Sequence, residues 1–258
     1  MPTPRQIGEI IRRHKPDGIV AAVDEEIFLI GRTLEALGIQ EEIRLAIPDR
    51  NVWEVFEDKL SLFRFLEEKG FPVPPTKRAS DADTLEYLFK PITGAGSKGV
   101  FIGQADRLPR NNELSRWIAQ EICHPPEITV DVMMDGAITH VLCRERIEVK
   151  NGVSVKARIF RDESLSALAD RLARSLGFVY GFCFQVMVAK GGGWRITDLN
   201  PRLGAGSAMS YLVGSDFFGA NIARILDASA PIGGFFKEFN GQAFVVRQYS
   251  EFLTERSA

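Results

Sequence analysis

Apolar residues recur at helical spacing in several segments of the chain. The three longest of these segments each stop at a glycine, a common residue just beyond the C-terminus of a helix. We therefore predict helices over residues 5–14, 25–37, 52–69 and 163–176, a short helix over 111–116, and helical content over 204–227.

Shorter runs rich in β-branched and aromatic residues alternate with turn signals, which predicts strands. The dipeptides Asp135-Gly136 and Asn151-Gly152 favour hairpin turns, and a third hairpin is expected around Gly191–Gly193. The predicted strands cover residues 19–23, 43–47, 85–90, 99–103, 180–188, 194–200 and 243–249, with others after Trp117. Because strands and helices come in runs, the predicted class is α+β, behind a small α/β start.

Composition narrows the kind of protein. The 258 residues are 45% hydrophobic and 26% charged, with a net charge of −2, which is typical of a globular protein and excludes a disordered or fibrous chain. This balance gives no broad basic surface for nucleic acid or for an anionic membrane. Apolar runs are too short for a membrane span, the N-terminus lacks the core of a signal peptide, and three cysteines suit a reducing compartment. We expect a soluble cytoplasmic protein.

A glycine-rich loop follows Lys90 and spans Gly94–Gly99. It spells G-x-G-x-x-G, but a strand rather than a helix is predicted after it, unlike a dinucleotide or P-loop motif. The catalytic tripeptides that accompany such a loop in protein kinases are absent from the sequence. Backbone N–H groups in a glycine hairpin can approach an anion closely, and a nearby lysine adds charge. Phosphate binding and a merely flexible turn both remain open at this point.

A second polar motif lies at the end of the last predicted hairpin, in Thr197–Arg202. Side chains alternate along a strand, so Asp198 and Asn200 share one face. The midpoint between Gln185 and Asp198 falls within the glycine turn, which predicts that these two residues lie opposite each other. Three such oxygen donors suit Mg²⁺ when substrate phosphates complete its shell. The plainer alternative is a polar sheet face with a turn.

These motifs together resemble the ATP-grasp superfamily, in particular the ATP-binding half of carbamoyl phosphate synthetase and small carboxylate–amine ligases. The resemblance extends over residues 52–227. It implies an ATP-grasp fold with a shortened α/β region over 1–50, a first subdomain over 51–123 that carries the glycine lid, and a second over 124–258 with the metal site. The residues that carry it are Asp58-Lys59, Gly70–Pro74, Lys90-Pro91, Gly94–Gly99, Gln120-Glu121, Glu127–Asp131, Gln185 and Asp198–Arg202.

The same resemblance implies the roles of the site residues. It implies ATP as ligand, with Mg²⁺, or Mn²⁺ in its place, held by Gln185, Asp198 and Asn200. Arg202 would stabilise the reacting group, and Lys156 would face the phosphates unless it is a surface lysine. Arg144 and Arg146 are candidates for gripping a carboxylate, or else they line a solvated sheet. The nucleotide contacts implied are Lys59, Lys90, Gly94, Gly96, Ser97, Gly99, Gln120, Glu121, Ile122 and Glu127.

The implied reaction joins a small-molecule carboxylate to an amine through an acyl phosphate, with release of ADP. A phosphotransferase, or a nucleotide-binding module with a degenerate site, is the alternative. Two departures motivate the latter: Asp198 replaces the family's usual glutamate, and only about 50 residues precede the matching region. The short N-terminus also raises the expectation of a homo-oligomer, whose second subunit would complete the site.

Overall fold

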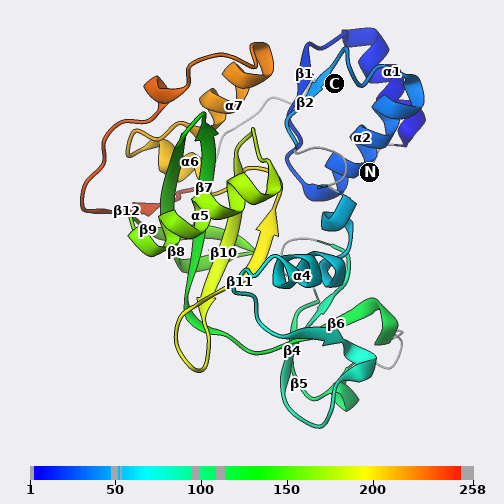
Figure 1. The fold of residues 1–258 in the computed structure, drawn as a ribbon, viewed down its shortest axis with the longest axis vertical. Helices are drawn as coiled ribbons and strands as arrows, with labels where there is room; N and C mark the ends of the chain where they lie inside the picture. The colour runs from blue at the N-terminus through cyan, green and yellow to red at the C-terminus, as the bar shows by residue number, and fades with distance from the viewer. Residues whose placement is uncertain (1–2, 48–51, 53, 95–98, 109–113, 251–258) are drawn as a thin grey trace.

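The computed structural model describes residues 3–47, 52, 54–94, 99–108 and 114–250. Within these residues, three sheets of two, four and six strands follow one another along the chain (Figure 1). The first is a parallel pair, β1 (Gly18–Ile19) and β2 (Arg44–Leu45), flanked by α1 (Pro4–His14) and α2 (Asp24–Leu37). The predicted strands over 19–23 and 43–47 are therefore reduced to two residues each.

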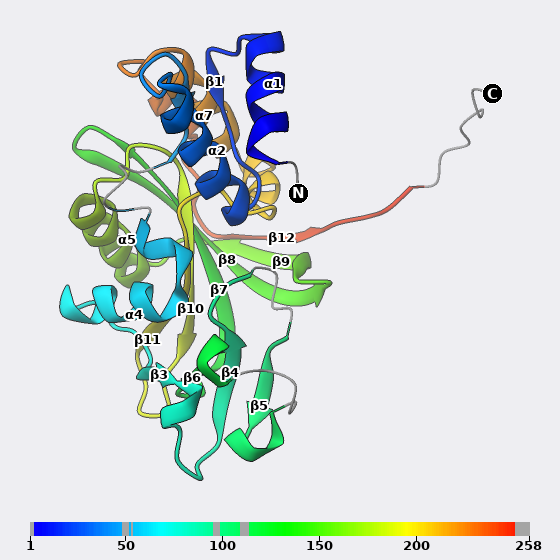
Figure 2. The same cartoon turned by 90° about the vertical axis from the view of Figure 1, so that its right-hand side faces the viewer.

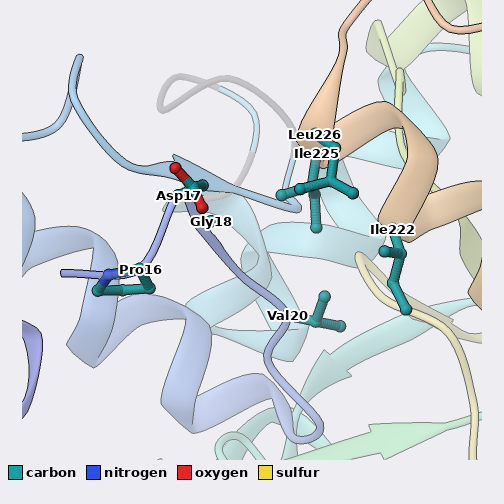
Figure 3. A pocket seen from close by; sticks show the side chains of 7 residues that line it. All are labelled: Pro16, Asp17, Gly18, Val20, Ile222, Ile225 and Leu226. Atoms are coloured by element: carbon teal, nitrogen blue, oxygen red, sulfur yellow. The ribbon is translucent and has the colours of Figure 1, made fainter. Parts of the chain in front are cut away.

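This N-terminal region packs against α7 (Phe217–Leu226), and β1 lies in contact with that helix. The Arg44 guanidinium donates to the carbonyl oxygens of Ile225 and Leu226, each at 2.7 Å, and so caps the last turn of that helix. A Cβ atom on Gly18 would lie only 2.0 Å from the Ile225 side chain. Beside this contact is an open hollow (Figure 3), lined by Pro16, Asp17, Gly18, Val20, Ile222, Ile225 and Leu226.

The four-stranded antiparallel sheet has the order β3-β6-β4-β5. Its strands are β3 (Thr76–Arg78), β6 (Trp117–Gln120), β4 (Tyr87–Pro91) and β5 (Phe101–Gly103). Short 3-10 turns lie at Ala79–Asp81, Ala105–Arg107 and Leu114–Arg116. Strands β4 and β5 pair with each other on either side of the glycine-rich loop, so the predicted strand–loop–strand arrangement is confirmed.

The helix predicted over residues 52–69 is broken at Asp58. A 3-10 turn covers Glu54–Glu57, and α4 covers Lys59–Glu68. The Asp58 carboxylate accepts hydrogen bonds from the backbone N–H groups of Leu60 and Ser61, at 2.7 and 3.1 Å, and so forms the N-cap of α4. The cap starts a new helix, with Lys59 as its first residue.

The six-stranded antiparallel sheet has the order β11-β10-β7-β8-β9-β12 and contains the main core. The hairpins predicted at Asp135-Gly136 and Asn151-Gly152 are confirmed, and Gln185 pairs with Asp198 as the turn position predicts. The strands are β7 (His124–Asp135), β8 (Ile138–Lys150), β9 (Val153–Phe160), β10 (Phe182–Val188), β11 (Trp194–Asn200) and β12 (Gln242–Val246).

Helices cover both faces of this large sheet (Figure 2). On one face lie α5 (Glu163–Leu176) and α4, whose Leu62 and Leu66 enter the main core. On the other lie α6 (Ser207–Tyr211), α7 and a 3-10 turn at Gly233–Phe235. Helix α4 also packs Leu60 and Phe63 against the four-stranded sheet, so it joins the two sheets and sets the space between them.

Candidate nucleotide and metal site

Lys90 joins the two larger sheets at the point where β4 faces β11. Its Nζ atom donates to the Thr197 carbonyl oxygen at 2.9 Å and lies 4.5 Å from the centre of the Phe63 ring. The residue is only 8% exposed. Burial lowers the pKa of Lys90 to about 8; Asp198 opposes the shift, and Lys59 adds to it. A partly desolvated ammonium beside a second lysine is a ready site for an anion.

Lys59 lies beside the start of the glycine-rich loop. Its Nζ atom donates to the Gly94 carbonyl oxygen, and its backbone N–H donates to Ile92 at 3.1 Å. Gly94 and Gly99 both have positive φ, 108° and 78°, which glycine adopts without strain. The predicted contacts at Gly96 and Ser97 lie outside the described residues. The structure thus brings Lys59, Lys90 and the base of the loop together.

The segment after β6 connects the two larger sheets. Gln120 is buried, and its Nε2 atom donates to the Thr76 hydroxyl at 2.9 Å, while the Glu121 backbone N–H donates to the Pro75 carbonyl at 3.0 Å. The Gln120 side chain is therefore part of the sheet's own structure. Ile122 and Cys123 follow, half-buried, where the chain leaves the small sheet for β7.

Three side chains form a polar cluster on one face of the large sheet: Glu127, Arg146 and Gln185. Arg146 Nη1 lies 2.9 Å from Glu127 Oε1, and Arg146 Nη2 donates to the Gly152 carbonyl at 2.9 Å. In the orientation that pairs its amide with both neighbours, Gln185 donates to Glu127 Oε1 and accepts from Arg146. Burial raises the pKa of Glu127, against the influence of Arg146 and with that of Asp198. Arg146 is thus held by the protein itself.

Asp198 and Asn200 lie on β11 next to this cluster. Asn200 Nδ2 donates to Asp198 Oδ2 at 3.3 Å. Among the described residues there is no group of three or more His, Cys, Asp or Glu side chains able to hold a metal ion. One carboxylate with two amides, from Asn200 and Gln185, is a weak donor set alone, but it fits Mg²⁺ when substrate phosphates supply further oxygens.

Arg202 follows β11 and reaches the N-terminal region. Its Nε atom lies 2.9 Å from Asp24 Oδ1, its Nη2 donates to Asp24 Oδ2 at 3.1 Å, and its Nη1 donates to the Leu203 carbonyl at 3.1 Å. Burial raises the pKa of Asp24; Arg202 opposes the shift, and Asp198 adds to it. Asp24 carried no signal in the sequence, because 178 residues separate it from its partner.

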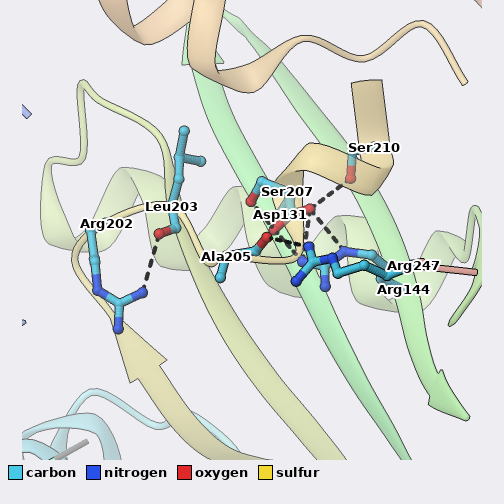
Figure 4. Close-up of polar contacts among 8 residues, drawn as sticks. All are labelled: Asp131, Arg144, Arg202, Leu203, Ala205, Ser207, Ser210 and Arg247. Atoms are coloured by element: carbon cyan, nitrogen blue, oxygen red, sulfur yellow. Dashed lines mark hydrogen bonds and ion pairs between the residues drawn. The ribbon is translucent and has the colours of Figure 1, made fainter. Parts of the chain in front are cut away.

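Arg144 has a structural partner instead of a substrate. Its guanidinium meets the fully buried Asp131 carboxylate at 2.9 and 3.1 Å, and Ser207 and Ser210 donate their hydroxyls to the same carboxylate, at 2.9 and 2.8 Å (Figure 4). A Cβ atom on Gly206 would lie 1.8 Å from Arg144 Nη1, so glycine permits this approach. The network fixes the start of α6, just beyond the Arg202 segment.

A model of the ATP-grasp domain family matches residues 56–206, which is more than half of the chain. The chain belongs to the ATP-grasp family. It is 24% identical over 254 residues to the carbamoyl phosphate synthase large chain of Methanothrix thermoacetophila, a match that covers 86% of this chain and 23% of the relative. The chain thus spans less than a quarter of the length of that relative.

Several solved structures have the same fold as this chain. Pyruvate carboxylase of Rhizobium etli matches with a TM-score of 0.76 at 15% identity, over 94% of this chain and 24% of its own. A second match is the biotin carboxylase domain dimer of Hydrogenobacter thermophilus 2-oxoglutarate carboxylase, solved with MgADP and bicarbonate. Its TM-score is 0.74 at 16% identity, and the match covers 93% of this chain and 60% of that chain. The L-amino acid ligase of Bacillus licheniformis matches with a TM-score of 0.67 at 14% identity, over 87% of this chain and 59% of its own. The predicted ATP-grasp fold is confirmed.

Lys156 lies apart from the other predicted site residues. Lys156 is exposed on β9, and its strand neighbours Ala157 and Ile159 are buried in the core under α6 and α7. Side chains alternate along a strand, so the Lys156 side chain lies on the opposite face of the sheet from Ala157 and Ile159, which is the face that α5 covers. The structure therefore favours the surface-lysine alternative for Lys156.

In the described part of the chain, no helix is long and apolar enough to cross a membrane.

Proposed function

We propose that this chain is an ATP- and Mg²⁺-dependent ligase, which activates a carboxylate as an acyl phosphate and joins it to an amine. The observation that carries the proposal is the contact of Lys90 with Thr197, next to Asp198. It places a desolvated cation from one sheet beside a candidate metal ligand from the other. A polyphosphate bound together with a divalent cation matches this pair, because the phosphate oxygens suit the Lys90 ammonium and the cation suits the Asp198 carboxylate.

We assign the nucleotide contacts as follows. The ammonium groups of Lys59 and Lys90 hold phosphate oxygens, and the loop that starts at Gly94 closes over them. The backbone of the connecting segment meets the base, and Glu127 meets the ribose hydroxyls. The proposed nucleotide contacts are Lys59, Lys90, Gly94, Gly96, Ser97, Gly99, Gln120, Glu121, Ile122 and Glu127.

Asp198, Asn200 and Gln185 are the proposed Mg²⁺ ligands. The metal ion supplies positive charge at the phosphate oxygens, where negative charge develops during transfer. The Glu127–Arg146 contact holds Gln185 in place, so the amide is oriented before any ligand arrives. Arg202, two residues beyond Asn200, offers guanidinium N–H groups to the reacting phosphoryl or carboxylate oxygens.

The proposed reaction has two steps. A carboxylate oxygen of the substrate attacks the γ-phosphorus of ATP; an O–P bond forms, and the bond to the β-phosphate oxygen breaks to leave ADP. An amine nitrogen then attacks the acyl carbon, a C–N bond forms, and inorganic phosphate leaves with the C–O bond electrons, while the amine loses a proton. Catalysis of this kind depends on the positioning of charged groups more than on a general base.

The test is ADP release in the presence of Mg²⁺ with pooled amino acids and small carboxylates, and with hydroxylamine present to trap acyl phosphate. We expect ADP with matching hydroxamate for the wild-type chain and neither for Asp198→Ala. The matched control is Glu163→Gln, a carboxylate on α5 that is exposed on the opposite face of the sheet. ADP without hydroxamate would overturn the ligase in favour of phosphotransfer. No turnover, with MgATP still raising the melting temperature, would indicate a binding module.

A further inference from the structure

The catalytic candidate Arg202 is held by a residue from the other end of the chain. Asp24 contacts two of its three guanidinium nitrogens, and the Leu203 carbonyl accepts from the third. Both side chains of the ion pair are largely buried, 14% exposed for Arg202 and 20% for Asp24. A guanidinium has five N–H groups. Nη1 and Nη2 each keep one N–H for a further acceptor, and the Nε–H makes no hydrogen bond although Nε lies 2.9 Å from Asp24 Oδ1.

The position of Asp24 is itself well fixed. It is the first residue of α2, which is anchored through the buried side chains of Ile27 and Leu34. Its carboxylate lies near Asp198, whose charge contributes to the raised pKa of Asp24. The ion pair therefore stands beside the proposed metal ligand, at the border of the N-terminal region and the large sheet.

We propose that Asp24 is a positioning residue of the active site, which orients the Arg202 guanidinium toward the reacting group and makes α2 part of the catalytic unit. This inference rests on the proposed function. An arginine side chain has several rotatable bonds and would otherwise sample many orientations next to the phosphates. A carboxylate that engages one edge of the guanidinium leaves the remaining N–H groups in a defined direction. The rival explanation is a purely structural tie between the N-terminal region and the rest of the chain.

The experiment compares three variants under the conditions that give turnover for the wild-type chain. Asp24→Asn removes the charge, Asp24→Glu keeps the charge but moves the carboxylate, and Glu25→Gln removes a neighbouring carboxylate from the same helical turn. The readouts are kcat for ADP formation, KM for ATP and the rise in melting temperature with MgATP. Arginine Nε–H signals in ¹⁵N spectra, assigned with Arg202→Lys, report the ion pair directly.

We expect Asp24→Asn to lower kcat by about 10- to 100-fold, as misplaced catalytic groups do, with KM for ATP changed less than about threefold. Asp24→Glu should give an intermediate kcat, and Glu25→Gln should stay within about twofold of the wild type. A structural tie would lower the melting temperature and leave kcat of the folded enzyme unchanged, which would overturn the inference.

If Asp24→Asn does not fold, Asp24→Glu decides, and a wild-type kcat for that variant overturns the proposal. If the wild-type chain itself releases no ADP, the proposed function fails and this inference falls with it. That result is distinct from failure of the inference alone, in which the wild type turns over and all three variants match it.

Discussion

Replacing Asp131 by asparagine tests how strongly the buried network under α6 holds the fold. The carboxylate is 0% exposed and its partner Arg144 has a 3% exposed side chain. Its hydrogen-bond partners among the described residues are the Arg144 guanidinium and the hydroxyls of Ser207 and Ser210, which all donate to it. The asparagine amide nitrogen would face these donors with another donor, and the Arg144 charge would lose its counter-charge in a site closed to water.

The expected loss follows from this burial. Breaking a buried ion pair from one side costs about 3–5 kcal/mol, because the remaining charge stays desolvated. For a domain of this size each kcal/mol shifts the melting temperature by about 2–4 °C, so a fall of about 6–20 °C is expected. The matched control is Asp170→Asn, whose partner Arg174 is 46% exposed and for which an exposed pair predicts about 0–1 kcal/mol.

Urea unfolding followed by circular dichroism measures both variants, with the slope m compared to confirm that the same transition is observed. A loss below about 1 kcal/mol for Asp131→Asn, or a loss equal to that of Asp170→Asn, would refute the reasoning. The double variant Asp131→Leu with Arg144→Met should recover much of the loss, because it leaves neither charge buried.

Three further predictions follow from single contacts. The pKa of Lys90 in the folded chain, about 8, lies below its ordinary value of 10.5, so the unfolded chain binds more protons between these values; the unfolding free energy of the ligand-free chain should rise across that pH range, and Lys90→Met should remove this rise. Gly18→Ala should cost about 1–3 kcal/mol by urea unfolding, because its Cβ would clash with Ile225, while Gly191→Ala, which has open space, should be neutral. Thiol labelling of the native chain should modify half-buried Cys123 before the two buried cysteines, and MgATP should slow it.

Features that depend on neighbouring residues were predicted well from the sequence. The helix over 163–176 is observed with the same bounds, and the pairing of Gln185 with Asp198 followed from the position of a glycine turn between them. The missed break at Asp58 had a readable signal, because aspartate is a preferred N-cap and an apolar run follows it. The regular apolar spacing on both sides concealed the break.

Contacts between distant residues had no such signal. The bond of Lys90 to Thr197 spans 107 positions, and nothing local indicates that these two strands face each other. The placement of Lys156 depends on β8 and β9, whose register shifts near Arg146 and Glu148, so the face that a residue occupies cannot be counted from the hairpin turn alone. Arg144 and Arg146 were candidates for gripping a carboxylate substrate, but both are buried and both have carboxylate partners within the protein.

The electrostatics of the site favour a ligand that carries both signs of charge. Lys90 has a lowered pKa because it is buried near Lys59, and a bound anion would reverse that shift. Glu127 and Asp24 have raised pKa values because they are buried near Asp198, and a bound cation would reverse those shifts. A lone anion would bring more negative charge to the carboxylates, and a lone cation would repel the lysines. A divalent cation bound together with a polyphosphate neutralises the lysines and the carboxylates at once. Each ligand should therefore strengthen the binding of the other at this site.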